Sequence, residues 1–105
     1  MSTQQAEAAF DRFRDDEAES ANIEEIKFFG FRALRLNGAS FVILDGDALA
    51  FKLGEDALQA ALALEGAKRW NPYGREKKKW IQVPAGQATA WDDCFDQAAQ
   101  LARNS

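Results

Sequence analysis

The hydrophobic and polar positions change their spacing several times along the chain, and each change marks a predicted element. Over residues 3–19, apolar residues recur at spacings of three and four while charged residues occupy the other positions. This is the pattern of a surface helix with a narrow buried stripe. The acidic side chains of this helix are explained as its solvated face. The buried stripe is Ala6, Ala9, Phe10 and Phe13.

A meander of three antiparallel strands is predicted after this helix. Asn37-Gly38, between the first two strands, is the dipeptide best suited to a two-residue type I′ turn, because both positions need a positive φ. Gly30 inside the first strand suggests a bulge or a close backbone approach. Alternation in the third strand indicates a sheet with one buried face. The three strands are rich in aromatic and aliphatic side chains and cover residues 28–36, 40–44 and 48–53.

The second half of the chain is predicted to add a helix, a strand and a closing helix. An apolar helical stripe runs from residue 55 to Gly66, a glycine placed to end the helix. A fourth strand covers residues 78–83, and Thr89 is the expected N-cap of the last helix. The order is therefore α-β-β-β-α-β-α. It predicts a single α+β domain over residues 1–105, with an antiparallel meander and a further strand packed with helices.

Composition supports one cytoplasmic domain without disulfides. The chain has 105 residues, of which 47 % are hydrophobic, so it has enough apolar surface for one core. Cys94 is the only cysteine and lies on the apolar stripe of the last predicted helix, where it is expected to be a small core residue. We find no signal sequence and no apolar run long enough to span a membrane.

The absence of histidine argues against an enzyme. Histidine is the commonest general base near neutral pH and the commonest neutral metal ligand. Asp45 and Asp47 alternate as in a calcium loop, but the rest of that pattern is missing and turn chemistry explains them. Lys52 is the one candidate for catalysis by a desolvated lysine, and a place on the outer face of its strand explains it better. We therefore predict no catalytic residue, no cofactor and no metal.

Opposite charges are concentrated in two segments. Residues 1–25 carry eight acids and two bases, and residues 68–80 carry six bases and one acid, within a net charge of −4. This balance excludes an overall basic nucleic-acid binder and leaves room for a local basic site. Alternatively, the acidic helix faces the basic segment and neutralises it, in one molecule or across a dimer.

The basic segment 68–80 also contains aromatic residues, so cations for phosphates would lie beside rings on which bases could stack. The tryptophans are also typical of core or loop anchors, and a lysine run is typical of solvated surface. Arg32 and Lys52 would extend the patch if they lie on the exposed face of the sheet. The candidate binding residues are Arg69, Trp70, Tyr73, Arg75, Lys77, Lys78, Lys79 and Trp80, with Arg32 and Lys52.

Five short motifs follow one another in a recognisable order. They are Phe-Phe-Gly at 28–30, Lys-Leu at 52–53, Pro-Tyr-Gly-Arg at 72–75, Lys-Trp at 79–80 and Val-Pro at 83–84. In order and spacing they resemble the N-terminal domain of TfoX-like proteins, over about residues 24–103. The resemblance implies a compact α+β domain of the YgaC/TfoX-N type, in which helices cover an antiparallel sheet.

The resemblance also implies a regulatory role. TfoX proteins regulate natural competence for DNA uptake, and the distantly similar MmcQ/YjbR group is described as DNA-binding. This sequence departs from the TfoX pattern, because it lacks their second, helical domain and has Phe28 where a methionine is usual. We therefore expect a non-enzymatic regulatory or interaction domain that binds a protein partner or forms a homodimer. The alternative is a module that binds nucleic acid through residues 68–80.

Overall fold

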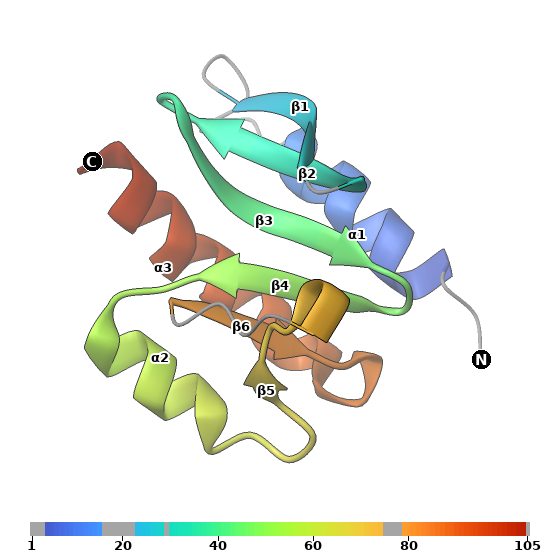
Figure 1. The fold of residues 1–105 in the computed structure, drawn as a ribbon, viewed down its shortest axis with the longest axis vertical. Helices are drawn as coiled ribbons and strands as arrows, with labels where there is room; N and C mark the ends of the chain where they lie inside the picture. Colours follow the sequence, from blue (N-terminus) through green and yellow to red (C-terminus); the bar gives the residue numbers. More distant parts are fainter. Residues whose placement is uncertain (1–3, 16–22, 29, 75–78, 105) are drawn as a thin grey trace.

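The computed structural model describes residues 4–15, 23–28, 30–74 and 79–104. Three α-helices and six strands lie in this part of the chain, together with two 3-10 helices, η1 and η2 (Figure 1). In chain order the elements are α1 (Gln4–Arg14), β1 (Ile23–Phe28), β2 (Phe31–Leu36), β3 (Ala39–Asp45), β4 (Ala48–Lys52), α2 (Glu55–Leu62), β5 (Lys68–Arg69), η1 (Pro72–Gly74), β6 (Trp80–Val83), η2 (Ala85–Ala90) and α3 (Trp91–Arg103).

The six strands form one antiparallel sheet in the order β1-β2-β3-β4-β6-β5. The predicted α+β class and the predicted succession of helices and meander are confirmed. The turn at Asn37-Gly38 is confirmed too, with φ values of 55° and 83°. These are the positive angles that a type I′ turn requires at both central positions.

The first predicted strand is divided in two, so the expectation of one strand over residues 28–36 is wrong. Phe28 ends β1 and pairs with Phe31 at the start of β2. Gly30 lies in the connection with a φ of 83°, which glycine adopts without steric cost, so the chain reverses there. The register irregularity lies further on, between Leu34 and Arg35.

Three helix boundaries also differ from the prediction. The helix α2 ends at Leu62, so Gly66 does not end it and lies in the turn that follows. The first helix ends at Arg14 and Asp15 is in a turn, while residues 16–19 lie outside the described part of the chain. Thr89 is not an N-cap, because η2 carries the backbone up to α3 and Ala90 takes the N-cap position without a side-chain hydrogen bond.

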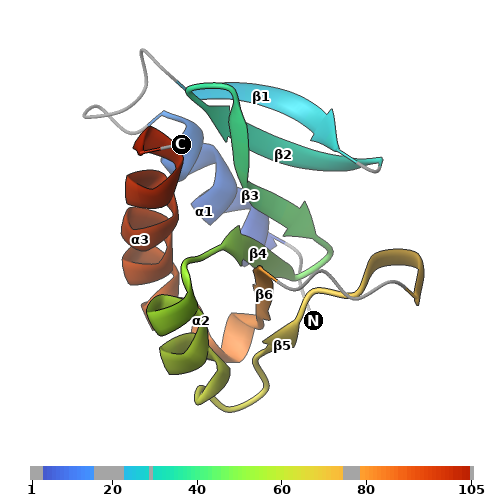
Figure 2. The ribbon, with the colours of Figure 1, turned by 60° about the vertical axis from the view of Figure 1, so that its left-hand side comes forward.

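The helices cover one face of the sheet, as Figure 2 shows. Phe13 of α1 stacks on Phe95 of α3 with ring centroids 4.4 Å apart and planes 3° apart, and Phe41 of β3 packs against Phe95. The Trp91 indole donates a hydrogen bond to the backbone oxygen of Val83 at 3.1 Å, which joins α3 to β6. This side of the sheet carries the larger hydrophobic core.

The opposite face is also partly buried, so the prediction of a single buried face is wrong. Ala33, Ile43 and Ala50 point to this helix-free face, where Trp70 and Trp80 cover them. Alternation places them opposite to Leu34, Val42 and Phe51, which belong to the main core. The side chains of Trp70 and Trp80 therefore take the place of a helix layer on this side.

Candidate interaction surface

Trp70 is the centre of the smaller core and anchors the loop that follows β5. Its side chain is 0 % exposed, and its indole nitrogen donates a 2.9 Å hydrogen bond to Oδ2 of Asp45. Its backbone N–H donates to the oxygen of Trp80 at 3.1 Å. The Trp70 ring lies 5.5 Å from the Trp80 ring and 5.6 Å from the Phe31 ring, centroid to centroid.

The two tryptophans therefore do not form a stacking platform for bases. Trp80 is 7 % exposed, and Phe28 stacks on it at 6.0 Å between centroids. A base can stack only on an accessible ring face, and the faces of these rings are taken by other side chains. Burial of these large apolar rings stabilises the fold. This agrees with the interpretation of the tryptophans as core or loop anchors.

The structure places the predicted cations on different parts of the molecule. Lys79 is exposed directly before β6. Lys52 is half-buried at the end of β4 and pairs in register with Trp80, so the two share the helix-free face. Arg69 in β5 pairs with Ile81, whose side chain belongs to the main core on the other face. Among the remaining predicted residues, the backbone of Tyr73 lies in η1, and the Tyr73 side chain, Arg75, Lys77 and Lys78 lie outside the described part.

Arg32 is not on the helix-free face. Its guanidinium lies 4.8 Å from the Phe10 ring of α1 and donates hydrogen bonds to Glu25 at 2.7 Å and to Asp11 at 2.9 Å. Arg32 is expected to extend the basic patch only if it lies on the exposed face of the sheet, and this condition is not met. Alternation in β2 allowed either face, and packing against α1 selected one.

Glu25 is the centre of this charge cluster. It accepts a further hydrogen bond from Arg14 at 3.0 Å, and Arg14 also contacts Asp11 and Asp15. The hydrogen bonds from Arg32 and Arg14 hold the pKa of Glu25 down at about 2. The helix α1 is therefore tied to β1 by the Arg14–Glu25 ion pair and to β2 by the Arg32–Asp11 ion pair, within its own molecule.

The strand β1 is the part of this surface that sequence reasoning missed. Among the described strands, β1 is bonded to β2 alone, and Figure 1 shows it at the edge of the sheet. Ile26 and Phe28 are half-buried on the helix-free face, beside Phe31 of β2. The alternation of Ile26 and Phe28 with Glu25 and Lys27 was a period-two signal for this strand.

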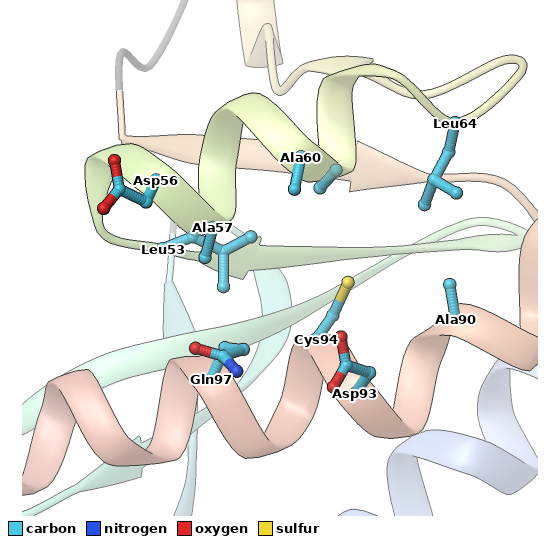
Figure 3. A pocket seen from close by; sticks show the side chains of 10 residues that line it. Leu53, Asp56, Ala57, Ala60, Leu64, Ala90, Asp93, Cys94 and Gln97 are labelled. Atoms are coloured by element: carbon cyan, nitrogen blue, oxygen red, sulfur yellow. The ribbon is translucent and has the colours of Figure 1, made fainter.

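An apolar hollow of about 400 Å³ lies between α2 and α3 (Figure 3). The Cys94 sulfur points toward α2 and into this hollow, while Asp56 and Asp93 carry the acidic groups at its rim. Burial, helped by the charge of Asp93, raises the pKa of Cys94 to about 11. The thiol is therefore protonated near neutral pH and behaves as an apolar side chain, as the sequence predicts.

The described residues hold neither a metal-binding group nor a helix suited to cross a membrane. No group of three or more potential ligands among histidine, cysteine, aspartate and glutamate is placed to hold a metal ion in residues 4–15, 23–28, 30–74 and 79–104. Within the same ranges, no helix combines the length and the apolar character that a membrane span requires.

Comparison of the chain with protein-family models, with curated proteins and with solved structures gives no match.

Proposed function

We propose that this chain is a non-enzymatic interaction domain that binds another polypeptide along β1, with the regulatory role that the TfoX-N resemblance implies and the cytoplasmic location that the composition predicts. The observation that carries the proposal is the position of β1 at the edge of the sheet, where β2 is its one partner among the strands in residues 23–28, 30–74 and 79–104, with a half-buried apolar strip beside it. The strip is Ile26, Phe28 and Phe31.

An edge strand presents a row of backbone N–H and C=O groups that another strand can pair with. Extended segments add to such edges in many protein complexes, with backbone hydrogen bonds providing affinity and side-chain contacts providing specificity. The strip gives such a partner an apolar surface next to the backbone edge. Aromatic side chains of this kind are enriched in interface cores.

Site-specific photo-cross-linking tests this proposal. A photoreactive phenylalanine analogue at position 26 of the full chain should give discrete polypeptide adducts, in purified protein or after incubation with extract of the source cells. The same analogue at Gln59, an exposed position on α2, is the control. If position 26 gives no more adducts than position 59 under both conditions, the proposed function is wrong.

A second candidate function is the binding of nucleic acid by phosphate contacts alone. It is favoured by the placement of Lys52 and Lys68 on the helix-free face. Lys52 pairs in register with Trp80, and Lys68 pairs with Gln82. Lys79, directly before β6, is a further exposed cation. Such binding weakens steeply with salt.

Fluorescence anisotropy with labelled single- and double-stranded oligonucleotides tests this candidate at low and moderate salt. The variant carries Lys77→Glu, Lys78→Glu and Lys79→Glu together. Salt-sensitive binding that this variant loses would favour nucleic acid, and no binding at low salt would exclude it.

A further inference from the structure

We propose that the partner of β1 is β1 of a second copy of the chain, paired antiparallel about Ile26. This inference rests on the proposed function and names the partner and the register. It joins two six-stranded sheets edge to edge into one continuous sheet, with the helices of both copies on the same side.

The two edges of the sheet are unequal. β1 has six residues, whereas β5 at the other edge has two. A pair of six-residue strands can form several backbone hydrogen bonds, and a two-residue strand can form few. Figures 1 and 2 both show β1 at the opposite edge of the sheet from β5.

Charge selects the register. In an antiparallel pair, residues directly opposite each other point to the same face of the sheet. The two-fold axis between the two β1 strands must therefore pass beside one residue of β1, and this residue then lies opposite the same residue of the second copy. An axis at Glu24, Glu25 or Lys27 would place two like charges opposite each other, which is destabilising. Of the four inner positions of β1, Ile26 alone meets itself without like-charge repulsion.

The register about Ile26 also creates favourable contacts. It sets Glu25 opposite the partner's Lys27, and symmetry makes this pair twice. Lys27 lies across from Arg32 in the β1–β2 pair, a like-charge neighbour. The partner's Glu25, which also accepts hydrogen bonds from Arg14 and Arg32 of its own chain, would add a carboxylate on the outer side of Lys27. On the other face, Ile26 meets the partner's Ile26, next to Phe28 of each copy.

Charged side chains on an edge strand often prevent pairing with other strands. In β1 the charges are self-complementary in one register, so they restrict the strand to that register. Oxidative cross-linking of single cysteines identifies the register, because a disulfide forms only when the Cα atoms of the two cysteines lie within about 7 Å of each other.

The experiment uses full-length chains that carry Cys94→Ala, so that each has one cysteine. Ile26→Cys should form a disulfide dimer with itself under mild oxidation. Glu25→Cys mixed with Lys27→Cys should form the mixed dimer in preference to either self-dimer. Gln59→Cys, at an exposed position on α2, should form no disulfide dimer. Equal cross-linking at positions 24, 25, 26 and 27 would overturn the register.

Sedimentation equilibrium of the purified chain provides the second arm. The unmodified chain should associate to a dimer, and Lys27→Glu should weaken dimerisation roughly tenfold, because two attractive pairs become repulsive. Lys68→Glu makes the same charge change on exposed β5 and should leave the dissociation constant unchanged. Equal effects of the two variants would contradict the proposed contact.

The two proposals fail in different ways. A chain that stays monomeric at all concentrations, but cross-links from position 26 to a different polypeptide in extract, overturns the dimer and leaves the proposed function standing. A monomer that gives no adduct at position 26 in extract overturns both.

Discussion

The indole nitrogen of Trp70 donates its hydrogen bond to the carboxylate of Asp45, 25 positions earlier in the chain, at 2.9 Å. This bond joins the end of β3 to Trp70, which with Trp80 covers the helix-free face. The Asp45 side chain therefore has a structural role as the acceptor for a buried ring.

Loss of this hydrogen bond should destabilise the protein. Trp70→Phe keeps an aromatic ring but removes the N–H group, so the partly buried Asp45 carboxylate loses its partner. We expect a decrease in the free energy of unfolding of about 1–3 kcal/mol, measured by urea denaturation. Asp45→Asn keeps a side-chain oxygen that can accept the bond and should cost less than Asp45→Ala. Equal costs for these two variants would show that the hydrogen bond contributes little.

Glu25 should contribute to the acid sensitivity of the fold. Its pKa is about 2 in the folded state, below the value of about 4.3 for an unperturbed glutamate. A carboxyl group with a depressed pKa stabilises the folded state above its unfolded pKa, and this contribution is lost as the pH falls toward the folded pKa. Urea midpoints should therefore fall more steeply for the wild type than for Glu25→Gln between about pH 5 and pH 2.

Glu65→Gln is the matched control for this titration, because Glu65 is exposed and lies outside the charge cluster of Glu25, Arg32 and Arg14. Its urea midpoints should follow the wild type at every pH. If Glu25→Gln also follows the wild type, the arginine contacts do not stabilise the fold.

Cys94 should react slowly with thiol reagents in the folded protein. Its side chain is 5 % exposed and its pKa is about 11, so at pH 8 its thiolate fraction is roughly a hundredfold below that of a free cysteine. Labelling with a chromogenic disulfide should become fast in urea. Asp93→Asn removes the nearby negative charge and should increase the folded-state rate modestly; fast labelling of the folded wild type would contradict the burial.

Gly66 should tolerate alanine less well than Gly38. Both have a φ of 83°, which costs an alanine about 1–2 kcal/mol. A Cβ at Gly66 would also lie 3.1 Å from Cγ of Pro84, whereas at Gly38 it would meet nothing within 4 Å. Thermal unfolding of the two variants should therefore give a lower Tm for Gly66→Ala, and the reverse order would mean that Pro84 moves without cost.

The sequence by itself determined the elements whose causes are local. The Asn37-Gly38 turn depends on two residues that accept positive φ, and the helical stripes of α1 and α3 follow the spacing of their apolar residues. The burial of Cys94 followed from its place on such a stripe. The division at Gly30 was less visible, because a glycine in an apolar run fits a bulge as well as a turn.

Only the tertiary structure decided which face or partner each side chain takes. The alternation of residues in β2 is compatible with either face of the sheet for Arg32. The contacts with Phe10 and Asp11 of α1 place its side chain on the face that the helices cover. Trp70 and Trp80 lie in a basic, turn-rich segment whose sequence fits both buried anchors and exposed stacking rings. Their burial depends on Ala33, Ile43 and Ala50, small or branched residues of three distant strands that leave room for the rings. Such long-range packing has no signature in local spacing, because it arises only when the sheet has formed.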